Sequence, residues 1–208
     1  MSVQNNKGLL LVLSGPAGSG KGTVVKQILD KYPEDFGLSV SATTRAPRPG
    51  EEHGVHYYFI DKPAFEERIE QGAMLEYAEY CGNYYGTPAD YVQKKLEEGK
   101  NVILEIEVQG ALKIKERLPD TLLVMITPPD FSTLEKRLRG RGTNTEEDIR
   151  NRLATSRWEL SNLERYDYVV INEDGKAGDA ADEIAAIVAS EKKKTCRNKD
   201  FAKIFFEN

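Results

Sequence analysis

Apolar and polar residues follow one another along this chain in blocks that predict strands and helices in turn. Short continuous apolar runs predict buried strands, and apolar positions three and four residues apart predict amphipathic helices. The expected strands are 9–13, 37–41, 57–60, 74–80, 101–106, 121–126 and 168–171. The expected helices are 24–29, 63–71, 91–98, 111–118, 129–139, 146–165 and 180–190, with Thr145 as an N-cap. Such alternation predicts an α/β fold whose parallel sheet is covered by helices on both faces.

The middle of the chain, residues 41–87, departs from this alternation. Pro47 and Pro49 exclude a helix in the Arg- and Gly-rich stretch that contains them. Residues 74–80 alternate between apolar and polar, which predicts an exposed edge strand. The Gly82-Asn83 turn then predicts a hairpin. We therefore expect a small β-rich insert in an otherwise regular α/β chain.

Composition adds limits to this picture. The chain has 208 residues, of which 39% are hydrophobic and 30% charged, so one domain with a real core and inserts is expected. Its apolar runs are too short to span a membrane, and its net charge of -5 argues against a general nucleic-acid binder. The N-terminus lacks the pattern of a signal peptide. Cys81 and Cys196 show neither metal-site nor disulfide spacing, so a reduced cytoplasmic setting is expected.

The most informative stretch is G-P-A-G-S-G-K-G-T, which lies between the first expected strand and the first expected helix. Glycines let the backbone curl around an anion, and the helix N-terminus adds partial positive charge. A lysine in this loop would bridge the outer phosphates of a nucleotide. A hydroxyl residue usually follows that lysine, but here Gly22 follows and Thr23 comes one place later. The residues expected to bind ATP are Gly15, Pro16, Ala17, Gly18, Ser19, Gly20, Lys21, Gly22 and Thr23.

A second anion site is predicted in the insert. Arg45 and Arg48 lie three residues apart in a loop stiffened by proline, and two guanidinium groups on a rigid loop suit a phosphate. Tyr57 and Tyr85 could add phenolic hydrogen bonds to the same anion. The alternative is an ordinary solvated loop of charged residues.

These residues also carry a family resemblance. Over about residues 9–172 the chain resembles the guanylate kinases, through G-P-A-G-S-G-K-G-T, S-V-S-A-T-T-R-A-P-R-P-G-E, G-N-Y-Y-G-T, L-E-I-E-V-Q-G and R-G-R-G-T. The resemblance implies ATP- and Mg²⁺-dependent phosphorylation of GMP and dGMP in purine metabolism. It implies a P-loop kinase fold, a three-layer αβα core with a β-rich GMP-binding insert and a helical lid. The expected boundaries are 8–38, 88–136 and 160–191 for the core, 39–87 for the insert, 137–159 for the lid and 192–208 for a tail.

The resemblance assigns roles residue by residue. The positions implied to bind GMP are Ser41, Arg45, Arg48, Glu51, Tyr57, Glu76, Tyr85, Thr87 and Glu107. The positions implied to act in catalysis are Lys21, Arg45, Arg137, Arg141 and Arg152, the last three in the lid. Arginines around a migrating phosphoryl group stabilise its transition-state charge. The alternative for the lid arginines is a solvated helix face with Glu–Arg pairs, to which Arg139, Arg150 and Arg157 are assigned.

The chemistry of three acidic residues supports specific roles. Guanine presents two adjacent donors, N1–H and the N2 amine, and the carboxylate of Glu76 could accept both, whereas adenine presents an acceptor at N1. Glu76 could instead be a solvated residue on an edge strand. Glu105 and Glu107 are expected on one face at the end of a strand beside the P-loop. There they would orient Mg²⁺ through water, or they would pair with nearby arginines. Glu107 occupies a position where the family usually has Asp.

Two other functions stay open at this stage. An adenylate kinase shares the G-x-G-K-G-T ending, and a non-catalytic scaffold could use a similar domain to bind peptides. The tail 192–208 is either a frayed or packed end or a partner-binding segment. The expected partners are ATP and GMP, with no nucleic acid or membrane, for a monomer or homodimer.

Overall fold

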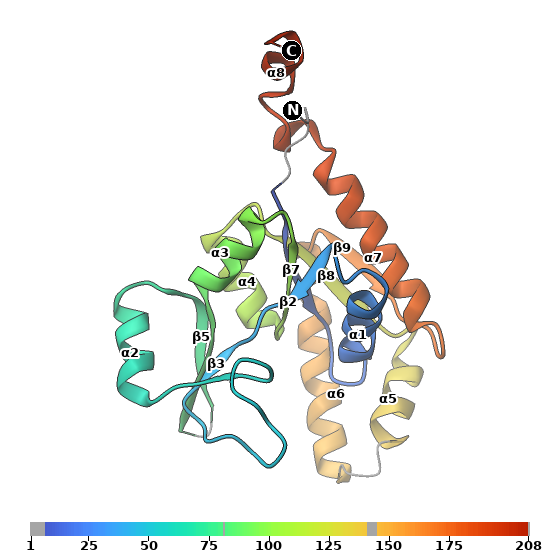
Figure 1. Cartoon of the computed structure of the whole chain (residues 1–208). Helices are drawn as coiled ribbons and strands as arrows, with labels where there is room; N and C mark the ends of the chain where they lie inside the picture. Colours follow the sequence, from blue (N-terminus) through green and yellow to red (C-terminus); the bar gives the residue numbers. More distant parts are fainter. Residues whose placement is uncertain (1–6, 81, 141–144, 208) are drawn as a thin grey trace.

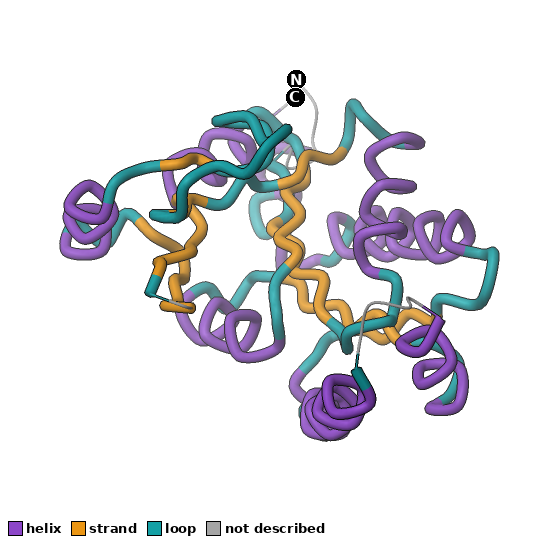
Figure 2. The backbone as a smooth tube through the Cα atoms, turned by 90° about the horizontal axis from the view of Figure 1, so that it is seen from below, coloured by secondary structure: helices purple, strands orange, loops and turns teal. Residues whose placement is uncertain are grey.

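The computed structural model describes residues 7–80, 82–140 and 145–207, and its centre is a parallel five-stranded sheet (Figure 1). The strand order is β2-β7-β1-β8-β9. The strands are β1 Leu10–Ser14, β2 Phe36–Leu38, β7 Asn101–Glu105, β8 Leu122–Thr127 and β9 Tyr168–Ile171. Because every pair in this sheet is parallel, all five strands end at the same edge. Helices lie on both sides of the row of strands (Figure 2), which confirms the predicted fold class.

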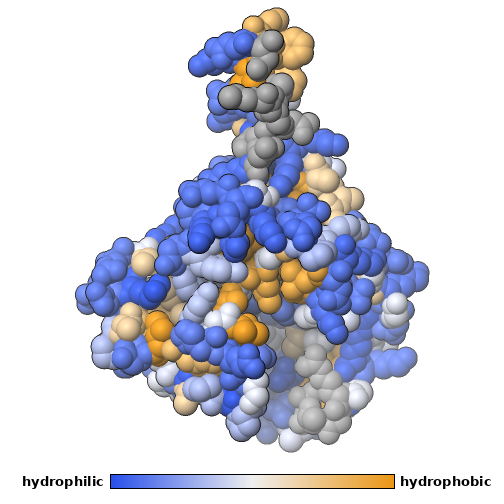
Figure 3. All heavy atoms as spheres, in the orientation of Figure 1, coloured by the Kyte–Doolittle hydropathy of each residue, from blue (hydrophilic) through white to orange (hydrophobic). Residues whose placement is uncertain are grey.

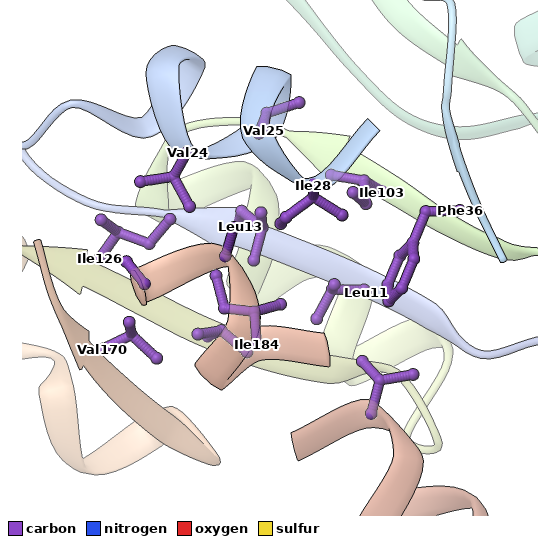
Figure 4. Close-up of a cluster of buried hydrophobic side chains, with 14 of the residues drawn as sticks. Leu11, Leu13, Val24, Val25, Ile28, Phe36, Ile103, Ile126, Val170 and Ile184 are labelled. Carbon is purple, nitrogen blue, oxygen red and sulfur yellow. The ribbon is translucent and has the colours of Figure 1, made fainter. Parts of the chain in front are cut away.

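One face of the sheet packs against α1 (Lys21–Lys31) and α7 (Ala177–Lys192). Strand periodicity sends Leu11 and Leu13 of β1 to this face. They meet Ile28 of α1 and Ile184 of α7 in the cluster drawn in Figure 4, where all four side chains are fully buried. This apolar layer fixes the start of α1, which the phosphate loop precedes.

The opposite face packs against α3 (Ala89–Glu97) and α4 (Val108–Arg117). Leu10 and Val12 of β1 point to this side and join Val92 of α3 and Ile114 of α4. Both faces of β1 are therefore apolar, which explains why its sequence is a continuous hydrophobic run instead of an alternating one.

A second sheet of order β4-β3-β6-β5 stands beside the first, together with α2 (Lys62–Glu70). Its strands are β3 Ala42–Thr43, β4 Tyr58–Phe59, β5 Met74–Tyr80 and β6 Asn83–Pro88. The edge position predicted for 74–80 is confirmed, since β5 pairs only with β6 among the described strands. The strand predicted over 37–41 is wrong in extent. The chain leaves the first sheet after Leu38 and enters the second at Ala42, so two short strands replace one.

Helices α5 (Phe131–Gly140) and α6 (Glu146–Ser161) pack against each other below the sheet (Figure 1). Thr145 caps α6 as predicted, because its hydroxyl accepts from the Asp148 N–H while the Asp148 carboxylate accepts from the Thr145 N–H. The helix predicted over 146–165 ends earlier, at Ser161, and a 3₁₀ turn, η1, covers Leu163–Arg165.

The C-terminal tail forms a 3₁₀ turn, η2 (Thr195–Arg197), and a short helix, α8 (Phe201–Glu207), which stands away from the rest of the chain (Figure 1). Phe201, Phe205 and Phe206 of α8 are exposed. On the face drawn in Figure 3, hydrophilic side chains cover most of the surface and apolar atoms gather in its middle. No helix of the described residues has the length and apolar character needed to cross a bilayer.

Candidate active site

The phosphate loop connects the end of β1 to the start of α1, at the edge where all five strands end. Gly15 has φ 150°, and a Cβ there would lie 2.0 Å from the Ile126 carbonyl oxygen. Gly20 has φ 85° and forms the N-cap of α1. A Cβ at Gly20 would lie 2.3 Å from Asn172 Nδ2. Both positions therefore require glycine for conformation and for space.

Lys21 begins α1 and bends back over the loop. Its Nζ donates to the Gly15 carbonyl and, at 3.4 Å, to the Pro16 carbonyl. These carbonyl oxygens hold the ammonium group at the mouth of the loop. An anionic phosphate oxygen can replace them as a stronger partner.

A hollow of about 720 Å³ adjoins the loop on the outer side of α1 and is lined by Gly18, Gly20 and Thr23 from the predicted ATP set. Arg137, at the end of α5, crosses one wall of it. Its guanidinium donates to the Asn172 carbonyl at 2.7 Å and pairs with Asp174 at 2.7 Å. Arg137, the first arginine of the predicted lid, also donates to the Ser19 carbonyl of the phosphate loop at 3.3 Å.

Asn172 and Asp174, which follow β9, were not predicted as site residues. The Asn172 side chain donates to the Ser19 carbonyl at 2.8 Å, and its own Oδ1 is buried without a hydrogen-bond partner among the described residues. Its only local signal was its place directly after a strand that ends at the same edge as β1. The two segments are 153 residues apart, so no local pattern joins them.

On the second sheet, Arg45 is the centre of a cluster of predicted GMP residues. Its guanidinium pairs with Glu51 at 2.9 Å and lies 5.6 Å from the centre of the Tyr57 ring. Tyr57 in turn meets Tyr85, with ring centres 6.1 Å apart. Arg48 enters through its backbone, whose N–H donates to Glu51 at 2.7 Å, while its side chain is exposed.

Glu51 therefore joins the two arginine positions of the loop. The hydrogen bond from Arg45, followed by that from the Arg48 backbone, lowers the pKa of Glu51 from 4.5 to about 2. The carboxylate stays ionised at neutral pH and fixes the direction of the Arg45 guanidinium. The geometry gives Glu51 a positioning contact with Arg45.

Glu76 and Thr87 meet across β5 and β6, where the Thr87 hydroxyl donates to the Glu76 carboxylate at 2.8 Å. Burial raises the pKa of Glu76, and the negative charge of Glu107 raises it further, while the Thr87 bond opposes the change. Ser41, Tyr57, Thr87 and Glu105 line one small cavity of about 130 Å³ between the two sheets. Four of the predicted residues are thus brought together there.

Glu105 and Glu107 were expected to share a strand face, and this expectation is wrong. Glu105 ends β7 and is exposed, whereas Glu107 is the N-cap of α4. The two oxygens of Glu107 accept from the Gln109 and Gly110 N–H groups, at 2.8 Å each. Glu105 lies beside the phosphate loop, since a Cβ at Gly22 would be 3.6 Å from its carboxylate.

The arginines predicted to act in a lid have different surroundings. Arg137 reaches the loop, as described above, and Arg152 lies exposed on α6. Arg141 lies outside the described residues. The three arginines assigned to the solvated face, Arg139, Arg150 and Arg157, are all exposed. Arg139 pairs with Glu135 at 2.8 Å, whereas Arg157 lies over the Phe131 ring, 4.7 Å from its centre.

Known proteins resemble the chain over nearly its whole length. The guanylate kinase family model matches residues 7–191. A guanylate kinase of Bacillus anthracis is 47% identical over 205 residues, which cover 99% of this chain and 98% of the relative. One of Enterococcus faecalis is 51% identical over 187 residues, 90% of this chain and 91% of the relative. The crystal structure of guanylate kinase from Anaplasma phagocytophilum has a TM-score of 0.70 and 34% identity, covering 93% of this chain and 91% of that one.

Proposed function

The chain belongs to the guanylate kinase family, and we propose that its phosphate loop holds ATP while its second sheet holds GMP. The activity is ATP-dependent phosphorylation of GMP and dGMP to the diphosphates, a transferase step of purine nucleotide metabolism. The observation that supports separate ATP and GMP sites is the presence of two separate cationic sites. One is built around Lys21 and main-chain N–H groups, and the other around Arg45.

ATP binds with its phosphates on residues Gly15 to Thr23. The glycines place consecutive N–H groups around the phosphates, and the N-terminus of α1 adds partial positive charge. Lys21 exchanges its carbonyl partners for the outer phosphates. The adenosine end takes the hollow beside α1, where Arg137 and Asn172 form part of the wall.

GMP binds on the second sheet. Its phosphate meets the guanidinium groups of Arg45 and Arg48 and the hydroxyls of Tyr57 and Tyr85, in a loop kept in shape by Glu51. Its guanine is read on the opposite side of the cavity.

There, the carboxylate of Glu76 accepts from N1–H and the N2 amine. Thr87, which lines the cavity together with Ser41, holds this carboxylate by its hydrogen bond. Glu107 is also part of this end of the site, because its negative charge acts on Glu76. Adenine would present a lone pair to Glu76, which explains the choice of base.

Mg²⁺ would arrive with ATP. The described residues contain no group of three His, Cys, Asp or Glu side chains arranged to hold a metal ion. The exposed carboxylate at the loop, Glu105, fits an oxygen-preferring cation that keeps its waters, and Gly22 leaves room for them. When bound, the ion would neutralise phosphate charge. Glu105 is the side chain that would orient its water shell, and Glu107 is occupied as a helix cap.

Transfer needs no covalent intermediate on the protein. The two sites hold the GMP phosphate oxygen in line with the terminal phosphorus of ATP, so catalysis is mainly positioning and charge neutralisation. Lys21 and Arg137 face the transferred group from the loop side and Arg45 faces it from the GMP side. Arg152 approaches as the proposed lid closes, and Arg141, which lies outside the described residues, keeps the catalytic role that the resemblance implies. Closure excludes water, which would otherwise hydrolyse ATP.

The alternative small-molecule kinase, an adenylate kinase, is disfavoured by Glu76 and by the arginine cluster of the second sheet. A purely non-catalytic scaffold is disfavoured by the intact phosphate loop with Lys21. We further propose that the enzyme acts in the cytoplasm as a monomer or homodimer, with no nucleic-acid partner, and that the division into core, insert and lid follows the boundaries expected from the sequence.

A coupled spectrophotometric assay tests the assignment with GMP, dGMP, AMP and UMP as acceptors. We expect the highest kcat/KM with GMP, a lower value with dGMP and little turnover of AMP or UMP. Calorimetric titration of GMP, with and without an unreactive ATP analogue, tests the two-site arrangement. A single shared site, in which the ATP analogue displaces GMP completely, would contradict it.

A further inference from the structure

A second cavity lies behind the proposed GMP site, on the other face of the same three strands. Its volume is about 390 Å³, and its walls come from β3, β4, the end of β6 and α3. Consecutive residues divide between the two cavities. Ser41, Tyr57 and Thr87 line the GMP-side cavity, and their successors Ala42, Tyr58 and Pro88 line this one. Strand periodicity explains the division, because neighbouring side chains point to opposite faces.

The inner part of this rear cavity is aromatic and aliphatic. Tyr58 of β4 and Tyr91 of α3 face each other with ring centres 6.3 Å apart, in an edge-to-face arrangement. Ile60, Ala42 and Pro88 complete the apolar lining. A flat ring entering here would stack on or beside two tyrosine rings, which prefer aromatic neighbours at such distances. The volume falls within the range of small-molecule sites.

The rim of the rear cavity carries more positive than negative charge. Arg68 of α2 and Lys94 of α3 are cationic, and Asp90 is the one carboxylate that the described residues place in the lining. Arg68 lies 3.7 Å from Asp90, too far for a strong hydrogen bond, and Lys94 takes part in none of the ion pairs found among residues 7–80, 82–140 and 145–207. His53, 5.6 Å from the Tyr58 ring, adds a further polar group. The rim therefore favours one anionic group.

We propose that the rear cavity binds a small planar aromatic ligand with a single negative charge. The ring packs against the Tyr58 and Tyr91 rings inside the cavity, and the anionic group lies at the rim beside Lys94 and Arg68. The rear cavity rests on the proposed GMP site in one respect only, namely that the two ligands occupy opposite faces of the strands. Binding to the rear cavity itself is a separate claim.

Naphthalene-2-sulfonate is a suitable probe, since it combines a flat ring with one charge and is smaller than the cavity. It is titrated into the full-length ¹⁵N-labelled protein, and amide chemical shifts report where it binds. We expect saturable shifts at residues 58–60 and 91–94. Neutral naphthalene-2-sulfonamide should bind at least about threefold more weakly, because it has no negative charge to interact with the cationic rim. Shifts scattered over the surface, or equal affinity for the two compounds, would overturn the proposal.

Two variants on one helix separate a local contact from general charge. Lys94→Gln should weaken sulfonate binding about threefold. Lys95→Gln removes the same charge one residue away, from a side chain that pairs with Glu98 at 2.7 Å, and should leave the affinity unchanged. Equal effects of the two variants would overturn the proposal. Tyr91→Ala should weaken both compounds, and its melting curve checks that it folds.

Saturating GMP distinguishes this site from the nucleotide site. The probe should remain bound in the presence of GMP, with its shifts still at residues 91–94. Complete displacement by GMP would place the probe in the GMP site and overturn the proposal. If the GMP assignment itself is wrong, the probe shifts at α3 and the Lys94→Gln effect remain as expected, so the two failures can be told apart.

Discussion

The Thr87 hydroxyl donates a 2.8 Å hydrogen bond to the carboxylate of Glu76, across the two strands that form the edge of the second sheet. This bond leaves the carboxylate with unused acceptor positions and fixes their direction. In the proposed GMP site, those positions meet the two adjacent donors of guanine.

Glu76→Gln should raise the KM for GMP about tenfold or more, because an amide offers one oxygen where the carboxylate offers two, and its NH₂ group faces a guanine donor. The KM for ATP should stay within about twofold, since the proposed ATP site is separate from Glu76. Steady-state kinetics with each substrate varied in turn measure both values. Glu79→Gln, on the exposed part of the same strand, is the matched control and should change neither. An unchanged KM for GMP would remove Glu76 from the guanine site.

The same substitution should affect stability in the opposite direction. Burial raises the folded-state pKa of Glu76 above its unfolded value, with Glu107 adding to the rise and Thr87 and Lys113 opposing it. A raised pKa means that the carboxyl favours folding while it is protonated and loses that contribution as the pH rises through the folded pKa. Glu76→Gln should therefore unfold at a higher temperature than the wild type at pH 7.

This stability difference should shrink on acidification, because the wild-type carboxyl then becomes neutral as well. Thermal melts of both proteins over a pH series measure it. A variant that is less stable than the wild type at neutral pH would show that the carboxylate of Glu76 carries no burial cost.

Lys21→Ala should lower kcat about 10³-fold, because a positive charge that faces the transferred phosphoryl group is lost. Its affinity for GMP should remain near that of the wild type. Stopped assays for turnover and calorimetry for GMP give the two quantities separately. Lys26→Ala, an exposed lysine on the same helix α1, should keep normal turnover. Near-normal kcat in Lys21→Ala would refute the role given to Lys21.

Glu51→Gln should raise the KM for GMP about threefold with a smaller effect on kcat, since Arg45 loses the partner that directs its guanidinium. Glu52→Gln is the control, because it removes the neighbouring carboxylate and leaves the Arg45 pair in place. If the two variants raise the KM equally, the effect is one of general charge near the phosphate and not of the Arg45 contact.

The pH dependence gives a second readout for Glu51. Its pKa is lowered from 4.5 to about 2, first by Arg45 and then by the Arg48 N–H. A lowered pKa contributes stability that is present above the unfolded value and is lost as the pH falls through the folded one. Between about pH 4.5 and 2, the stability of the wild type should fall more steeply than that of Glu51→Gln. Chemical denaturation at several acidic pH values measures the two slopes.

Gly20→Ala should destabilise the protein more than Gly50→Ala, although both glycines have φ near +85°. Both substitutions strain the backbone, at a cost of about 1 kcal/mol or more. Only at Gly20 would the new Cβ also collide with another group, 2.3 Å from Asn172 Nδ2, whereas none of the described residues has an atom within 4 Å at Gly50. Urea denaturation curves compare the free energies of unfolding. Equal losses would mean that Asn172 moves aside without cost.

The strands of the central sheet were predicted well from the sequence, for a physical reason. β1 and β8 are buried on both faces, so each appears as an uninterrupted apolar run between polar residues. The exchange of sheets between Leu38 and Ala42 could not be predicted in this way. Residues 37–41 continue a strand pattern in the sequence. In the structure, the Ser39 N–H makes a bond to the Ile103 carbonyl of β7, and the chain then turns away toward the second sheet.

The site shows the same limit. Residues near one another in sequence, such as Arg45 and Glu51, could be grouped in advance, although the ion pair itself could not. Contacts over long separations were missed, as with Asn172 and Ser19. Glu107 was misplaced because its sequence fits a strand end. The two N–H groups from which it accepts point toward its carboxylate only once α4 has formed. Tertiary contacts decide such cases, and local patterns carry no record of them.

The strand order has a consequence for how the chain is made. β1 leaves the ribosome well before β7 and β8, the two strands that flank it. In the sheet, Leu10 lies opposite Val102 of β7 and Leu11 lies opposite Leu122 of β8. The apolar β1 therefore has no neighbouring strand of the sheet to pair with on both edges until the polypeptide has been synthesised past Leu122. Such distant pairing slows folding and exposes the nascent chain to aggregation, so this protein is expected to depend on late, nearly simultaneous closure of its sheet.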